Sequence, residues 1–394
     1  MRKNEIVFLA MLLLGFNTKA IKPQETIARL ARISLTILHT FNGTDGSQPT
    51  VPLTLGDDQC LYGIAEHGGK KNCSDNGGCG TIFKLERQGN GREFQLVFSF
   101  PNTTNYSPTS PLVSLNGTLY GLSAMGLNFG ANLYSVKINE SLSIIQFIPS
   151  NSLSAGITLQ KGKFFGVADS SSTSPPNVQF FSLESDGSNF ETFVVDNKLV
   201  GTAIASPMLS AENGYLYGTA SRVGTFKGGT VFRLDPLTQK ADLVCSFNET
   251  VGTDPLNLMQ TTDDRIFGVA VSGGTYNAGT LFEVHENSCD TVHSFNKIDG
   301  LSPIGKLVQY DEKTLYGTTL VGGKNGRGNI YEVTLGDEVM VTSVYDFDSS
   351  EGGFPSAGLT KAGNNTFYGV NSGWDTIHDR IESNGTIFEF VITE

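Results

Sequence analysis

The side chains best suited to bind a ligand are aromatic residues that stand among glycines and acids that lie in short turns. Trp374, the one tryptophan of the chain, is followed directly by Asp375. An aromatic ring can stack on the apolar face of a sugar while nearby carboxylates bond to its hydroxyls. Equally, such rings can wedge between structural units and such acids can cap turns. Our candidate ligand-binding residues are Trp374, Asp375, Phe129, Phe226, Tyr276, Asp254 and Asp299.

Catalytic chemistry has weaker support in the sequence. No GxSxG, HExxH or P-loop motif is present, and no cysteine or histidine spacing predicts a metal site. His39 and His293 both stand two residues before a phenylalanine in related segments, so we expect packing roles for them. We expect no metal and no cofactor. The enzymatic alternative is a glycoside hydrolase or lyase with Asp254 and Asp299 as a carboxylate pair, roughly 5 to 9.5 Å apart.

Seven copies of an aromatic-glycine pair recur at intervals of 45 to 58 residues. Each copy leads through a glycine-rich stretch to a step such as Gly229-Thr230-Val231-Phe232, then to a run ending in phenylalanine and to a short apolar run. Four short runs per repeat, separated by Gly, Asn, Asp and Pro, predict one four-stranded propeller blade. The pairs are Tyr62-Gly63, Tyr120-Gly121, Phe165-Gly166, Tyr217-Gly218, Phe267-Gly268, Tyr316-Gly317 and Tyr368-Gly369.

The two ends of this repeat array complement each other. Residues 35–41 form a fourth strand with no strands before it, whereas the last repeat stops after its third strand at Phe390. We therefore expect residues 35–41 to pair antiparallel with residues 385–391, which removes two exposed sheet edges. The sequence thus predicts an all-β fold, a closed seven-bladed β-propeller of four-stranded blades, as a single domain over residues 35–394.

The repeat elements Leu-Tyr-Gly-Thr, Gly-Gly and Gly-Thr-Val-Phe resemble the GloVer tandem-repeat family of secreted bacterial proteins. Residues 216–219 with 228–232, and residues 315–319 with Gly322-Gly323, match these elements best. The resemblance covers nearly the whole chain after its first twenty residues and implies a secreted repeat protein, but it brings no catalytic residues. The third repeat departs from the pattern, because residues 170–176 replace its Gly-Gly loop.

The first strand of each expected blade would line the central channel, and these seven strands contain no Asp, Glu or His. Channel catalysis therefore lacks titratable groups. The loops between second and third strands, and those between blades, leave a propeller on one common side. They carry the candidate residues, so we expect this face to bind a glycan or a glycosylated extracellular protein. A structural or host-directed secreted effector is a third alternative.

The N-terminal residues 1–20 have the three zones of a secretory signal: basic Arg2-Lys3, apolar residues 6–16 and a small residue at Ala20. We expect cleavage after Ala20, a lead segment over residues 21–34, and an extracellular protein. We expect no membrane insertion, because the apolar run is shorter than the roughly 20 residues that a spanning helix needs. The net charge of −12 argues against nucleic acid as a partner.

Sequons and cysteines fit a secretory route. Of the five cysteines, Cys73 and Cys79 lie in one glycine-rich loop and are our predicted disulfide. The pairing of Cys60, Cys245 and Cys289 is left open, and the plainest interpretation of Cys245 is a small buried apolar residue. N-glycosylation sequons, nearly all in expected loops, stand at Asn42, Asn72, Asn102, Asn105, Asn116, Asn139, Asn248, Asn364 and Asn384.

Overall fold

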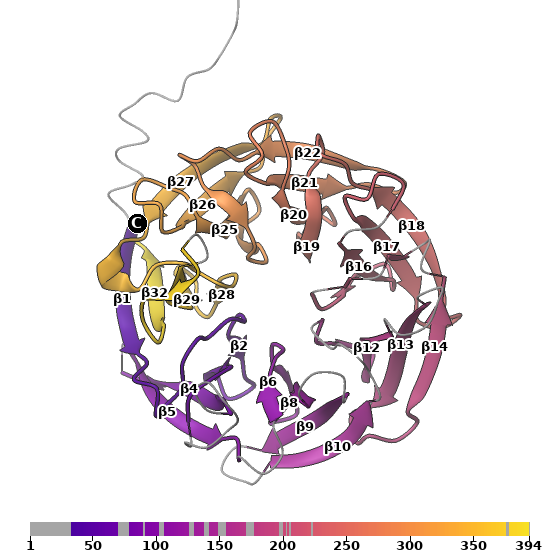
Figure 1. The fold of residues 1–394 in the computed structure, drawn as a ribbon, viewed down its shortest axis with the longest axis horizontal. Helices are drawn as coiled ribbons and strands as arrows, with labels where there is room; N and C mark the ends of the chain where they lie inside the picture. The colour runs from indigo at the N-terminus through magenta and orange to yellow at the C-terminus, as the bar shows by residue number, and fades with distance from the viewer. Residues whose placement is uncertain are drawn as a thin grey trace, which may run out of the picture.

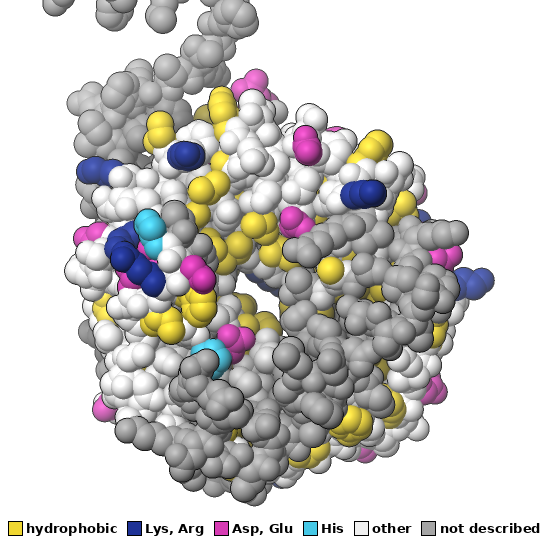
Figure 2. Space-filling model, viewed as in Figure 1, with side chains coloured by type: hydrophobic (Ala, Val, Ile, Leu, Met, Phe, Trp, Pro, Cys, Tyr) yellow, Lys and Arg dark blue, Asp and Glu magenta, His cyan; other side chains and the backbone are white. Residues whose placement is uncertain are grey.

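The computed structural model is a ring of seven blade sheets, with one small two-stranded sheet besides (Figure 1). The space-filling view shows an opening at the centre of the ring (Figure 2). Within the part of the chain that is described, no helix is long and apolar enough to cross a membrane. The structure describes residues 33–69, 79–89, 91–101, 106–125, 130–137, 142–148, 155–170, 177–196, 200–201, 203–204, 206–221, 224–375 and 378–393.

Each blade holds four strand positions, which we call a, b, c and d from the centre to the rim. In blades 2 and 6 two short strands share position a. Blades 1 to 4 comprise β2 (Thr54–Leu55), β3 (Leu61–Ala65), β4 (Thr81–Gln88) and β5 (Gly91–Ser99); β6 (Tyr106–Pro108), β7 (Val113–Leu115), β8 (Thr118–Met125), β9 (Ala131–Lys137) and β10 (Leu142–Ile148); β11 (Ile157–Gln160), β12 (Lys163–Ser170), β13 (Asn177–Glu184) and β14 (Glu191–Val195); and β15 (Leu209–Ser210), β16 (Leu216–Ala220), β17 (Thr230–Asp235) and β18 (Lys240–Ser246).

Blades 5 to 7 follow the same order, and blade 7 takes its d strand from the N-terminal part of the chain. A short 3₁₀-helix, η2 (Ser349–Glu351), precedes blade 7. These blades comprise β19 (Thr253–Gln260), β20 (Ile266–Ser272), β21 (Thr280–Val284) and β22 (Cys289–Ser294); β23 (Leu301–Pro303), β24 (Val308–Asp311), β25 (Thr314–Val321), β26 (Asn329–Thr334) and β27 (Met340–Asp346); and β28 (Thr360–Lys361), β29 (Thr366–Asn371), β32 (Thr386–Ile392) and β1 (Ile33–Thr40).

The repeated aromatic-glycine pair and the repeated Gly-Thr-x-Phe step meet across the sheet. Gly218 on a b strand lies opposite Phe232 on the c strand, and a Cβ added to Gly218 would lie 2.2 Å from the Phe232 ring. Gly63 stands in the same relation to Phe83, at 2.3 Å. The aromatic ring thus lies over the glycine and excludes any side chain there. This contact explains why the two motifs recur together.

The apolar core lies mainly between neighbouring blades. Leu61 and Phe83 of blade 1 pack in one cluster with Tyr368 and Ile387 of blade 7, and Phe41 joins them from the end of β1. Every blade therefore buries its b and c strands against the blades on both sides, and a ring that failed to close would leave such an interface open to water.

The predicted ring closure is confirmed. β1 pairs antiparallel with β32, from Ile33 opposite Ile392 to Thr40 opposite Thr386. The backbone N–H of Phe41 extends the pairing with a 3.0 Å hydrogen bond to Gly385. In Figure 1 the indigo β1 accordingly lies along the outer side of the yellow β32. β1 begins at Ile33, two residues before the predicted start at Leu35.

The cysteines differ in part from the prediction. Cys245 and Cys289 form a disulfide, so the interpretation of Cys245 as a plain apolar residue is wrong. Cys79 is disulfide-bonded, whereas Cys73, its predicted partner, lies outside the described residues. Cys60 is a buried free thiol.

Five of the sequon asparagines belong to the described residues, and all five lie outside the strands, as predicted. Their occupancy by glycans stays a prediction. The five are Asn42, Asn116, Asn248, Asn364 and Asn384, while Asn72, Asn102, Asn105 and Asn139 lie outside the described residues.

Candidate functional site

The b–c loops and the connections between blades share one face, as expected. The residue before the proline of strand a donates its backbone N–H to the b–c loop of the preceding blade. Asp254 bonds to Gly228 O and Ser302 to Ala278 O, each at 2.9 Å. Both donors adopt a left-handed φ of 57°, which is uncommon for residues other than glycine. This bond fixes each loop against the next blade, and we call this side of the ring the loop face.

Trp374 stands on a small hairpin of the loop face, inserted between the b and c strands of blade 7. The hairpin pairs β30 (Trp374–Asp375) with β31 (Arg380–Ile381). Asp375 is only 3% exposed, and its carboxylate accepts the His378 backbone N–H at 3.2 Å and contacts the His378 ring Nδ1 at 2.6 Å. Trp374 itself is 37% exposed. A buried carboxylate thus anchors the turn that presents the tryptophan.

Charged side chains surround the base of this hairpin. Arg380 contacts the Asp375 carboxylate at 3.6 Å and donates to Glu382 at 2.7 Å. Arg327, from the b–c loop of blade 6, also pairs with Glu382 and lies over the Phe354 ring, 5.2 Å from its centroid. The Arg327 hydrogen bond, followed by that of Arg380, lowers the pKa of Glu382. These contacts tie the hairpin to two blades.

A groove of about 410 Å³ lies beside the hairpin, lined by Arg380, Ile381 and Glu382 together with Ser349 and Gly352. The space-filling view shows basic, acidic and histidine side chains gathered over blade 7 on this face (Figure 2). Ile381 lies opposite Trp374 in the hairpin and is 60% exposed. The site therefore offers an aromatic ring, an aliphatic side chain and both signs of charge within one short segment.

The other candidate aromatics lie apart from Trp374. Phe226 and Tyr276 occupy the b–c loops of blades 4 and 5 and are 61% and 64% exposed. Among the described residues, no ring-to-ring contact joins either of them to Trp374. Phe129 lies outside the described residues. The loop face thus presents aromatic side chains on separate blades, and the hairpin of blade 7 is the place where one is combined with a charged network.

The two candidate acids lie in different surroundings. The Asp299 carboxylate accepts the Asn296 backbone N–H at 2.7 Å and contacts the His293 ring at 3.1 Å. Asp45 repeats this turn with Asn42 and His39. Asp299 therefore has a turn-stabilising role that accounts for its carboxylate. Asp254 is half-buried, and its backbone has the left-handed φ described above.

The predicted packing of the two histidines agrees with the structure. His39 stacks on Phe94 with ring centroids 3.6 Å apart, and His293 meets Phe295 edge to face at 4.9 Å. Each ring nitrogen also contacts the carboxylate of an aspartate in the following turn, Asp45 or Asp299, a contact that was not predicted from the sequence. Neither position forms a nucleophile-base pair in the described part of the chain.

Four residues of the Trp374 site were not predicted from the sequence: His378, Arg380, Glu382 and Arg327. A usable signal was present for three of them, since His378, Arg380 and Glu382 alternate in a loop that lacks the Gly-Gly turn. Alternating charged residues beside a lone tryptophan indicate a hairpin with one polar face. Among the described residues no group of three or more His, Cys, Asp or Glu could hold a metal ion.

The fold defines a seven-bladed β-propeller. The Gloeobacter/Verrucomicrobia repeat matches residues 148–388, and the chain belongs to this repeat family. That match confirms the resemblance to GloVer repeats. No curated protein sequence matches the chain.

Solved propeller structures resemble the whole ring at low sequence identity. YCF48 bound to D1 peptide is 10% identical with a TM-score of 0.53, over 92% of this chain and 96% of that one. The PQQ-bound aldose sugar dehydrogenase from Streptomyces coelicolor is 12% identical with a TM-score of 0.46, over 92% and 98%. The β-propeller domain of the Trilobed protease from Pyrococcus furiosus is 10% identical with a TM-score of 0.48, over 88% and 97%. At these identities the likeness shows the fold alone.

Proposed function

We propose that the protein is a secreted, non-catalytic binding module that recognises a glycan, free or carried on an extracellular protein, at the Trp374 hairpin. The observation that carries the proposal is the anchoring of Trp374. Its neighbour Asp375 is buried and engages both His378 and Arg380, so the ring is held in place before a ligand arrives. A preorganised aromatic platform loses little conformational entropy on binding.

The groups around Trp374 suit a hydroxyl-rich ligand. Sugar rings stack on aromatic faces, and their hydroxyls both donate and accept hydrogen bonds. Arg380 and Glu382 supply a donor and an acceptor beside the groove. The Asp299 carboxylate, one member of the pair on which the enzymatic alternative depends, is already engaged by the Asn296 backbone N–H and the His293 ring, which supports the non-catalytic assignment. The Cys245–Cys289 disulfide supports an oxidising, extracellular location.

The test is binding to a broad glycan array by the purified mature chain and by Trp374→Ala. We expect signals above background for the wild type and a loss of about 30-fold in affinity for the variant, the size typical of an aromatic hot spot. Met340→Ala is the matched control, because Met340 is 39% exposed on the outer strand β27. Equal array signals for all three proteins would overturn the assignment of this site. Silence of the wild type, together with capture of a non-glycosylated protein partner, would overturn glycan recognition.

Because Trp374 is the sole tryptophan, its fluorescence reports on the proposed site directly. A glycan that stacks on the ring should change the emission maximum or intensity in a saturable way. Phe226→Ala, which removes an exposed ring of blade 4, should leave that titration unchanged.

A further inference from the structure

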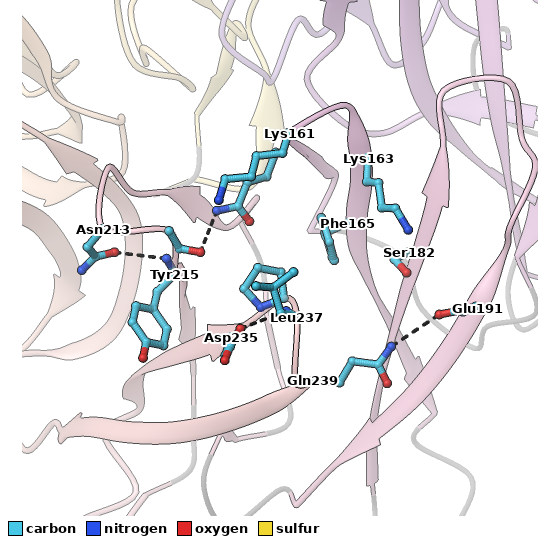
Figure 3. A pocket seen from close by; sticks show the side chains of 13 residues that line it. Lys161, Lys163, Phe165, Ser182, Glu191, Asn213, Tyr215, Asp235, Leu237 and Gln239 are labelled. Carbon is cyan, nitrogen blue, oxygen red and sulfur yellow. Dashed lines mark hydrogen bonds between the residues drawn. The ribbon is translucent and has the colours of Figure 1, made fainter.

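A second groove, of about 540 Å³, lies between blades 3 and 4 (Figure 3). One wall is the turn between β11 and β12, and the other consists of the a–b and c–d turns of blade 4. In a four-stranded antiparallel blade these turns lie at the end opposite to the b–c loop. The groove is therefore on the face opposite the Trp374 hairpin, and its function is independent of the one proposed above.

Hydrogen bonds between the two blades brace this groove at its inner and outer ends. Near the centre of the ring, the Gln160 side-chain Nε2 donates to Gly214 O at 2.9 Å. Towards the rim, the Gln239 Nε2 meets the Glu191 carboxylate at 3.5 Å, and Figure 3 shows these two side chains reaching towards each other. These contacts join the two walls at both ends of the groove, and its volume lies in the range of roughly 300 to 1,000 Å³ typical of small-molecule sites.

Gln160 leaves one side-chain acceptor unused. Gln260 of β19 and Gln309 of β24, which stand where blade 3 has Leu159, each accept a backbone N–H from the preceding blade, that of Glu212 or Thr262, at 2.9 Å. Gln160 is 6% exposed, and its Oε1 is buried without a hydrogen-bond partner. Because Gly214 O can only accept, the amide orientation is fixed. Gln160 thus brings a buried acceptor without a partner to the wall of the groove.

Lys161 adds an unpaired positive charge to the same wall. It is exposed, and its ammonium makes no hydrogen bond or ion pair within the described part of the chain, whereas the neighbouring Lys163 pairs with Glu184 at 3.4 Å. Figure 3 shows Lys161 extending from its turn towards the side of the groove that carries Asn213. In a chain of net charge −12, a free ammonium in a groove favours an anionic ligand.

Apolar surface completes the groove. Leu237, from the c–d turn of blade 4, is 85% exposed, and the half-buried Tyr215 ring lies under the Arg233 guanidinium, 5.4 Å from it. Both residues line the groove with Phe165. A ligand here meets an ammonium, an aromatic ring with a hydroxyl, and an aliphatic side chain, while the lining carboxylates of Asp235 and Glu191 accept hydrogen bonds from the Leu237 backbone N–H and the Gln239 side chain.

We propose that this groove binds a small sugar acid, a monosaccharide-sized ring that carries one carboxylate. The carboxylate pairs with the Lys161 ammonium, and the ring packs against Tyr215 and Leu237. A ligand hydroxyl supplies the donor that Gln160 Oε1 lacks. Because that oxygen is covered, its engagement requires a small shift of the groove lining.

The experiment measures binding of galacturonic acid and of galactose to the full mature chain by titration calorimetry at low ionic strength. We expect galacturonic acid to bind and galactose to bind at least tenfold more weakly, since galactose lacks the carboxylate. Lys161→Met should weaken galacturonic acid binding at least tenfold, and Lys161→Arg should restore most of it. Lys297→Met, which removes an exposed lysine of the loop face, should bind as the wild type does.

Two outcomes would overturn the proposal: no binding of galacturonic acid by the wild type, or equal binding by Lys161→Met. The Trp374→Ala variant separates this site from the hairpin site. We expect it to bind galacturonic acid unchanged, and a loss of binding in that variant would assign the sugar acid to the hairpin and refute the groove. Gln160→Leu should weaken galacturonic acid and galactose by the same factor, because it removes a contact to the hydroxyls only.

Discussion

The Sγ atoms of Cys245 and Cys289 are bonded across two neighbouring blades. Cys245 lies on β18, the outer strand of blade 4, and Cys289 begins β22, the outer strand of blade 5. Their Cα atoms are 5.8 Å apart. Neighbouring blades otherwise adhere through apolar packing, such as that of Val231 and Phe282 in one cluster. The bond is therefore a covalent clamp at the rim, where the blades diverge.

Removing this clamp should destabilise the protein without changing its fold. The bond closes a loop with a sequence separation of 44, for which the loop-closure estimate is about 4 kcal/mol. We expect the double variant Cys245→Ser, Cys289→Ser to lose about that much free energy of unfolding, measured by urea titration with circular dichroism. Cys60→Ala, which removes the free thiol, is the control. Equal urea midpoints for the double variant and the wild type would contradict the clamp.

Ring closure by β1 should be essential for folding. A chain that begins at Gly43 lacks Phe41, which is 2% exposed, and the half-buried Leu35 and Ile37 that pack in blade 7. At about 1.5 to 3 kcal/mol per fully buried large side chain, the loss approaches the whole stability of a typical domain, and the β32 edge becomes free to aggregate. We expect aggregation or failed secretion. A chain that begins at Arg32 is the control and should melt with the full mature chain.

The Trp374 hairpin should depend on the Asp375 charge. Asp375→Asn keeps the shape of the side chain but weakens its bonds to His378 and Arg380, so the hairpin should loosen while the blade stays folded. We expect stronger acrylamide quenching of Trp374 fluorescence with little change in Tm. The control is Asp379→Asn, which alters an exposed acid of the same turn. Identical quenching in both variants would show that Asp375 does not anchor the hairpin.

The blades could be predicted because the repeat occurs seven times in the sequence, and the closure of the ring could be predicted from the incomplete repeats at its two ends. The contact of Gly218 with Phe232 has an equivalent in every repeat, so the two motifs stand out against loops of variable length. The incomplete repeats at the two ends then require Leu35 and Phe390 to meet, as they do. The disulfide escaped prediction because it joins the end of one outer strand to the start of the next, a relation that depends on how blades tilt against each other.

The candidate sites could be predicted only in part, because each occurs once. Trp374 and Asp375 were recognisable as unusual residues, but the contact of Arg327 with Glu382 spans two blades and 55 residues of sequence. The Gln160 groove left no sequence signal at all. Its distinguishing feature is a buried Gln160 oxygen without a hydrogen-bond partner, which depends on how blades 3 and 4 pack and not on residue type.

His39 should make the closing strand sensitive to acid. Burial lowers the pKa of His39, and the facing Asp45 offsets only part of this effect. The unfolded chain then binds a proton at a higher pH than the folded chain does, so stability rises with pH in this window. The His39 contribution should be complete above about pH 6.5, the usual pKa of histidine, and should decline as the pH falls towards the lower folded-state pKa.

We expect His39→Gln to reduce the difference in unfolding free energy between pH 7.5 and pH 5.0, measured by urea titration. His285→Gln, at a more exposed histidine, is the control, and an undiminished pH difference in His39→Gln would show that the buried ring on β1 does not cause it.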